Sequence, residues 1–308
     1  MTSRILTIAL ALGSLPVFGQ LDLDGTWAAQ WHQDFQESGR GPDTADYLGL
    51  PLSAGGIARA LNYSPATLAE PDHQCIWYGP EYLLGTAAGF KIWADSDPST
   101  GTIAAWKISG QLDRSPITIW MDGRPHPPAY ARHTFDGFTT GEWQGDILKT
   151  YTTHMKEGHL RRNGAPQSDQ ATFTMHIIRH GDILTVVGTV EDPVNLTEPF
   201  VLTRDFRLNA HGQGGMNLTP CVPETEISRP DTGEPTVPHY LPGTNPFAGE
   251  FSKTYHIPAE VTNGGPETMY PEIRKKLTTY QPPAKCTRYC CGGTSGAEGI
   301  PKGCVVTN

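Results

Sequence analysis

The sequence has few charged residues and no surplus of basic ones. Charged side chains make up 18% of the 308 residues, and 32 acidic residues outnumber 23 lysines and arginines, which gives a formal net charge of -9. Binding to nucleic acid through phosphate contacts needs a surplus of Lys and Arg. The composition therefore argues against nucleic acid as a main partner. Low charge together with 34 Gly and 27 Pro also argues against a coiled coil or helical bundle.

Long apolar runs are scarce as well. One short run, residues 5–12, follows Arg4 and precedes Val17-Phe18-Gly19, a pattern typical of a secretory signal peptide cleaved before Gln20. This run is too short for a membrane-spanning helix, which takes about 20 residues. We therefore expect a signal peptide at residues 1–19, a periplasmic or secreted protein, and no transmembrane segment.

Six cysteines fit an oxidising compartment. Cys75 and Cys221 lie in Pro-flanked loops, and we expect them to pair with each other. The other four crowd one short segment, at Cys286, Cys290, Cys291 and Cys304. That array could bind zinc, but export favours disulfides, whose connectivity the adjacent cysteines leave open.

The middle of the chain alternates between apolar and polar residues with a period of two, which indicates β-strands. Ile117, Ile119 and Met121 alternate with more polar neighbours, and residues 90–95, 172–177 and 200–208 show the same alternation. Turn signals separate these runs at hairpin spacing, without helical patterns between them. The sequence therefore predicts an all-β fold, an antiparallel barrel or folded-over sheet over residues 20–210.

Further signals refine this architecture. Gly25-Thr26-Trp27 is typical of the first strand of lipocalin-like barrels, where the Trp plugs one end. Ser53 is a plausible N-cap for a short helix over residues 53–61. For residues 211–280 the sequence predicts a Pro-rich segment that wraps the core, with one short helix over residues 266–277. For residues 281–308 it predicts a Cys-rich tail.

The segment of residues 117–169 is densest in residues that could carry chemistry. A His beside an Asp can move a proton near neutral pH, and Arg binds anionic oxygens in pairs. We expect a small apolar or aromatic ligand in the barrel mouth, converted, if at all, by isomerase-, hydratase- or lyase-type chemistry without a cofactor. The proposed roles are proton carrier for His126 or His154, orientation by Asp122, anion binding by Arg124 and Arg161, and ligand contact by Trp120 and Tyr130.

Two other functions stay open at this point, and so does the question whether the protein is an enzyme. His126, His133 and His154 could bind Zn or Cu, with Asp122 or Glu142 as a carboxylate ligand. The sequence lacks the spacings of established metal motifs such as HExxH. Alternatively, the protein is a structural or interaction protein of the envelope that makes contacts through its tail. A monomer or weak dimer is expected.

Several runs together resemble a family of exported bacterial proteins of uncharacterised activity. The resemblance covers roughly residues 24–278. It implies export and a single β-rich unit, implies no particular reaction, and does not extend to the Cys-rich tail. The runs that carry it are residues 47–51, 118–128, 141–146, 153–158, 161–164, 180–182, 191–193 and 239–246.

Overall fold

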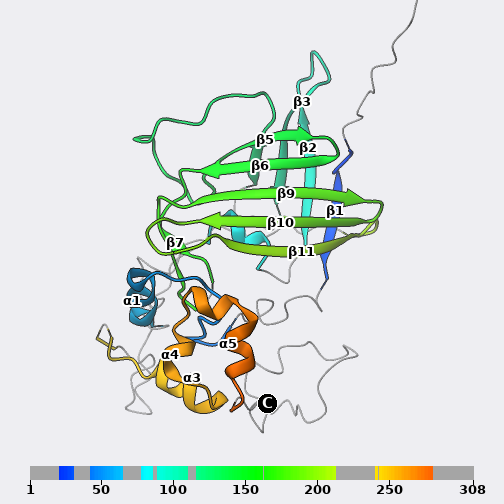
Figure 1. Ribbon diagram of the computed structural model, residues 1–308. Coiled ribbons are helices and arrows are strands. Elements are labelled where there is room, and N and C mark those ends of the chain that lie inside the picture. Colours follow the sequence, from blue (N-terminus) through cyan, green and yellow to red (C-terminus); the bar gives the residue numbers. More distant parts are fainter. Residues whose placement is uncertain are drawn as a thin grey trace, which may run out of the picture.

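The computed structural model describes residues 21–30, 42–64, 78–85, 89–109, 116–161, 163–212, 240–241 and 243–279. A closed β-barrel forms its centre, with strands in the order β1-β11-β10-β9-β6-β5-β4-β3-β2 (Figure 1). The prediction of an all-β barrel is confirmed. The barrel strands are Gly25–Ala29 (β1), Phe90–Ser96 (β2), Ile103–Ser109 (β3), Ile117–Trp120 (β4), Phe138–Gln144 (β5), Ile147–Thr153 (β6), Thr172–His180 (β9), Ile183–Glu191 (β10) and Phe200–Leu208 (β11).

One strand pair departs from the antiparallel pattern that the sequence predicts. β4 and β5 are parallel, with Ile119 beside Thr139 and Trp120 beside Thr140. A parallel pair needs a long connection, because the chain must return to the end at which the first strand began. Residues 121–137 provide that return outside the barrel. The barrel is therefore mixed, and the expectation of a purely antiparallel sheet is wrong at this pair.

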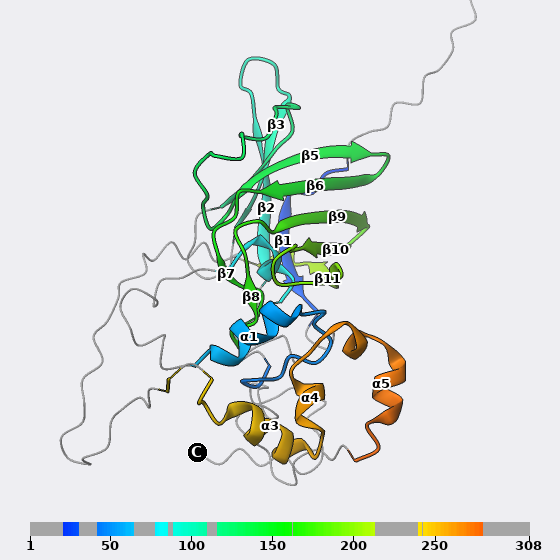
Figure 2. The ribbon, with the colours of Figure 1, turned by 60° about the vertical axis from the view of Figure 1, so that its left-hand side comes forward.

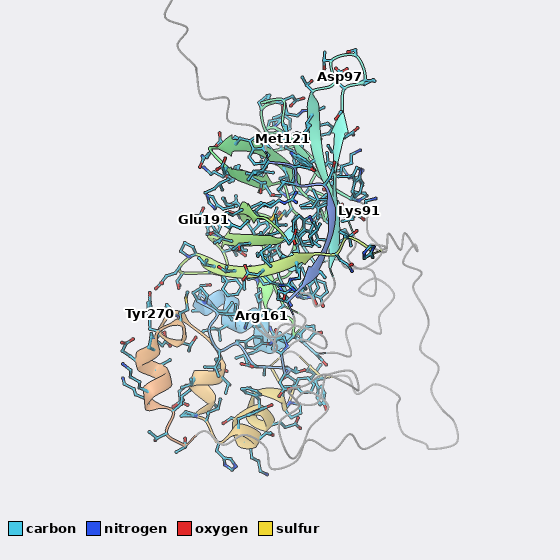
Figure 3. The ribbon with its side chains drawn as sticks, turned by 90° about the vertical axis from the view of Figure 1, so that its right-hand side faces the viewer. Lys91, Asp97, Met121, Arg161, Glu191 and Tyr270 are labelled. Carbon is cyan, nitrogen blue, oxygen red and sulfur yellow. The ribbon has the colours of Figure 1, made fainter. Side chains whose placement is uncertain are left out.

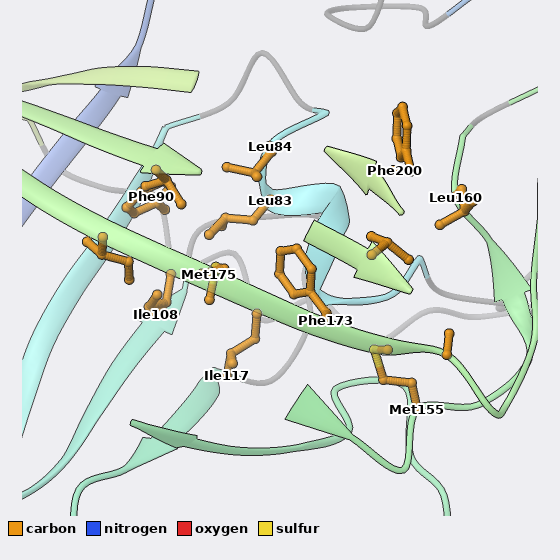
Figure 4. Packing of buried hydrophobic residues seen from close by; sticks show 14 of the residues in the cluster. Leu83, Leu84, Phe90, Ile108, Ile117, Met155, Leu160, Phe173, Met175 and Phe200 are labelled. Carbon is orange, nitrogen blue, oxygen red and sulfur yellow. The ribbon is translucent and has the colours of Figure 1, made fainter. Parts of the chain in front are cut away.

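The period of two places apolar side chains inside the barrel. In β9, Phe173, Met175 and Ile177 are at most 1% exposed, while the residues between them are partly exposed. The inner side chains pack into one buried cluster (Figure 4). Trp27 is fully buried in it, its Nε1 donates to the Leu23 carbonyl at 3.1 Å, and the Arg179 guanidinium lies 5.3 Å from its ring.

Helices gather at one end of the barrel, beside the small sheet of β7 (Gly158–His159) and β8 (Pro166–Gln167) (Figure 2). Helix α1 (Ala54–Asn62) begins where predicted, since the Ser53 hydroxyl accepts a hydrogen bond from the Gly56 amide at 3.0 Å. The remaining elements are the buried 3-10 turn η2 (Pro80–Leu83), α3 (Phe247–Tyr255), α4 (Ala259–Thr262), the 3-10 turn η3 (Pro266–Met269) and α5 (Pro271–Lys276).

The single short helix predicted for the wrapping segment is thus an underestimate. Within residues 243–279 of this segment, the structure has α3 and α4 before the predicted position, and the 3-10 turn η3 and α5 at that position. Each of these helices is short and begins at or just after a proline, and α3 buries only Phe251, so no long apolar period marks them in the sequence. The expected signal peptide, all six cysteines and the Cys-rich tail lie outside the described residues. Within those residues, no helix has both the length and the apolar character to span a membrane.

Candidate functional site

His126 lies on the outer wall of the barrel, not in its interior. Its Nδ1 is 2.7 Å from the Thr153 hydroxyl and its Nε2 is 2.8 Å from the Thr140 hydroxyl. Thr152 and Thr139, which precede Thr153 and Thr140 in the sequence, face inward and hydrogen bond each other at 2.8 Å. Because side chains alternate along a strand, Thr140 and Thr153 face outward. The return segment of residues 121–137 is therefore fastened to β5 and β6 through this imidazole.

The Thr153 hydroxyl joins His126 to a second histidine, His154. It lies 2.7 Å from His154 Nδ1, and His154 Nε2 lies 3.0 Å from the Pro128 carbonyl. A carbonyl only accepts, so Nε2 of a neutral His154 carries the proton and Nδ1 accepts from Thr153. The Thr153 oxygen must then accept from His126 Nδ1, which leaves His126 Nε2 to accept from Thr140. The donors and acceptors of this series of hydrogen bonds thus all point one way, from the Thr140 hydroxyl through His126, Thr153 and His154 to the Pro128 carbonyl.

Burial of His126 lowers its pKa, and the nearby His154 lowers it further because a second positive charge is unfavourable there. His126 is therefore neutral at neutral pH, as this series of hydrogen bonds requires. Both of its ring nitrogens, and both of those of His154, are already engaged. We conclude that these two histidines anchor the loop.

His133 completes the predicted group of three histidines. Its Nδ1 lies 2.8 Å from the Met155 carbonyl and its ring lies 5.1 Å from that of His154. The structure thus brings the three histidines together, but with the described residues only Nε2 of His133 forms no hydrogen bond. In the part of the chain that the structure describes, no three His, Cys, Asp or Glu side chains are grouped to hold a metal.

Asp122 pairs with Arg124 and not with His126. The ion pair measures 2.5 Å, and the Arg124 guanidinium stacks on the Trp120 ring at 3.6 Å from its centre. Hydrogen bonding by Arg124 lowers the pKa of Asp122 to about 2. Tyr130 is 91% exposed. These four predicted residues lie on the outer surface, and the predicted orientation of His126 by Asp122 is not formed.

Arg161 lies elsewhere, at the end of the barrel near the helices (Figure 3). Its guanidinium is 5.4 Å from the ring of Phe200, the first inward residue of β11, and its Nη1 donates to the Leu48 carbonyl at 3.3 Å. Burial raises the pKa of the neighbouring Asp46 to about 6, although the positive charge of Arg161 acts in the opposite direction. A carboxyl group that titrates near neutrality beside a guanidinium is typical of acid-base sites.

Segments far apart in the sequence meet at this position. The Asn163 amide donates to the carbonyls of Asp43 at 3.1 Å and Asp46 at 2.7 Å, and the Tyr47 hydroxyl donates to the Ala60 carbonyl at 2.7 Å. The Tyr255 hydroxyl donates to the Asp43 carboxylate at 2.7 Å. We call Asp43, Asp46, Tyr47, Arg161 and Asn163 the base cluster.

Sequence reasoning singled out only Arg161 from the base cluster. The available signal was that residues 47–51 and 161–164 both carry the resemblance, and the structure joins these two runs through Tyr47, Leu48, Arg161 and Asn163. Nothing in the local sequence marks Asp46, because its pKa depends on packing against distant residues.

Comparison of the chain with protein-family profiles, curated proteins and solved structures gave no match. The resemblance to a family of exported proteins therefore stays a prediction.

Proposed function

We propose that the protein is exported and binds an apolar or aromatic small molecule with a carboxylate end at the base cluster. The observation that carries this proposal is the position of Arg161, whose guanidinium lies against Phe200 at the barrel end and beside Asp46. Guanidinium binds carboxylate through paired hydrogen bonds. Phe200 and the adjoining apolar core would receive the rest of the ligand.

Asp46 would be the proton-exchanging group of this site. We assign this role to Asp46 rather than to His126 or His154, because the nitrogens of both rings already hold the loop. With a pKa of about 6, Asp46 can take up or release a proton near neutral pH. This suits isomerase-, hydratase- or lyase-type chemistry on the bound molecule.

Benzoate, which combines an aromatic ring with a carboxylate, tests the proposal on the full chain. We expect benzoate to raise the melting temperature of the wild type and of Arg207→Gln, because Arg207 is exposed on β11 away from the base cluster. Arg161→Gln should lose the effect. Equal responses of the two variants would contradict the proposal.

The pH dependence of benzoate binding distinguishes a role of Asp46 protonation from simple attraction of the benzoate carboxylate by Arg161. A protonated Asp46 does not repel the ligand carboxylate, so affinity should fall as pH rises through about 6. Asp46→Asn should remove this dependence and keep the affinity high. Mass spectrometry of an organic extract of the native protein would identify the natural ligand.

The alternative of a Zn or Cu enzyme at His126, His133 and His154 makes a different prediction. Binding would require His126 and His154 each to give up a hydrogen bond of the loop anchor. Elemental analysis of protein purified without chelators would then find one metal ion per chain, and His133→Ala would remove it.

A further inference from the structure

The inner wall formed by β3, β5 and β6 carries three polar atoms without a hydrogen-bond partner among the residues that the structure describes. They are Nε1 of Trp106, Nε1 of Trp143 and Oγ1 of Thr150, all of them buried. Trp106 is 1% exposed and Thr150 is 0% exposed. A buried polar group without a partner is unusual in a folded protein, and such groups commonly mark a missing ligand or water.

The strand register places the three residues on one part of the inner wall. Thr150 pairs directly with Gly141 across β5 and β6, and Trp143 is the next inward residue after Gly141. On the other side, Trp106 pairs with Ile119 of β4. Ile119 borders Gly141, since its Cγ2 lies 2.7 Å from where a Cβ on that glycine would be. Along the inner face, Ile119 of β4 and Gly141 of β5 therefore lie between Trp106 and Thr150.

Other polar groups on the same wall are satisfied. The hydroxyls of Thr139 and Thr152, one step further along β5 and β6, hydrogen bond each other at 2.8 Å. The three unpartnered atoms thus form a distinct set.

We propose that this wall binds a neutral, apolar or aromatic molecule that presents a carbonyl or ether oxygen to Trp106, Trp143 and Thr150. The two indole N–H groups can only donate, so the ligand must accept, and the Thr150 hydroxyl can add a third donor. The three groups are uncharged, so they offset the desolvation of a carbonyl but not that of a full charge. This site and its ligand class differ from the carboxylate site at Arg161.

Adaptable side chains surround the position. Met175 pairs with Thr150 from β9 and belongs to the buried cluster in Figure 4. The Met121 sulfur lies 2.7 Å from the position of a Cβ on Gly141. Thioether side chains repack readily around a guest. Trp143 is partly exposed although its Nε1 is buried, so its ring reaches from the interior to the surface near the β5–β6 hairpin.

A pair of probes isolates the oxygen acceptor. Acetophenone and ethylbenzene have similar size and shape, but only acetophenone carries a carbonyl oxygen. Titration of the full chain, followed by tryptophan fluorescence and melting temperature, gives the affinity for each. We expect the wild type to prefer acetophenone by roughly 10-fold, the effect of about one net hydrogen bond.

Thr150→Val keeps the shape of the side chain and removes the hydroxyl, whereas Trp143→Phe removes the indole N–H together with one ring. Each should reduce the preference, and Thr150→Val is the cleaner test. Thr203→Val, on the exposed face of β11, is the matched control and should leave it unchanged. Arg161→Gln should also leave it unchanged, which separates this site from the proposed carboxylate site. Absence of acetophenone binding in the wild type, or an equal preference in Thr150→Val and the control, would overturn the inference.

Discussion

Asp46→Asn should stabilise the protein at neutral and higher pH. In the folded chain burial raises the pKa of Asp46 from 3.8 to about 6. Since one pKa unit corresponds to about 1.4 kcal/mol, ionised Asp46 costs at most about 3 kcal/mol in the folded state relative to the unfolded chain. Asp46 keeps some contact with solvent, which lowers the expected gain for Asn to about 1–3 kcal/mol.

The sign of the pH dependence follows from proton binding. Between about pH 4 and pH 6 the folded chain holds more protons at Asp46 than the unfolded chain does. The free energy of unfolding should therefore decrease as pH rises through this range, and Asp46→Asn should remove that decrease. At about pH 4 the variant and the wild type should be nearly equal in stability, because Asp46 is then protonated in the folded protein.

Urea denaturation of the full chain, followed by tryptophan fluorescence at about pH 4 and about pH 8, measures this difference. Asp169→Asn is a suitable control, because Asp169 is exposed. The reasoning fails if Asp46→Asn destabilises the protein at the higher pH, or if its gain is the same at both values. The first result would mean that the positive charge of Arg161 and the hydrogen bond from the Leu48 amide stabilise ionised Asp46 more than burial destabilises it. The second would mean that the gain does not come from the ionisation of Asp46.

Four other substitutions test the local structure, each by urea denaturation. Thr153→Val removes the hydroxyl between the two imidazoles of the loop anchor and should cost about 1–3 kcal/mol. Ser53→Ala removes the N-cap of α1 and should cost about 1 kcal/mol. Gly188→Ala should cost about 1–3 kcal/mol, because the new Cβ would lie 2.5 Å from a Leu84 carbon. Gly249→Ala in α3 has open space and should instead stabilise by up to about 1 kcal/mol.

The barrel could be predicted because its strands alternate cleanly. Phe173, Met175 and Ile177 are buried while their neighbours are not, and this pattern depends only on the period of a strand. The parallel pairing of β4 with β5 could not be predicted in the same way. It depends on residues 121–137, which contain little apolar periodicity and are held to the wall by individual side chains such as His126.

The candidate site was predictable only where residues are close in the sequence. His126, His133 and His154 were grouped as an alternative metal site, and hydrogen bonds and a ring contact bring them close to one another. Their hydrogen-bond partners, two threonines and two carbonyls, carry no signal that distinguishes an anchor from a catalytic group. Asp46 was missed for a different reason, since its raised pKa arises from burial among segments more than a hundred residues apart.

A residue can bind a ligand or exchange a proton only if it has a polar atom that is not already engaged within the fold. By this criterion His126 and His154 are weak candidates for a catalytic role, because all four of their ring nitrogens are hydrogen bonded within the protein. Asp46 meets the criterion, since its carboxyl can gain or lose a proton near neutral pH. Thr150 meets it differently, with a buried hydroxyl that no described residue satisfies. A ligand that forms hydrogen bonds with such groups offsets the free-energy cost of burying them without a partner. For this reason we place the candidate functions at the base cluster and the inner wall.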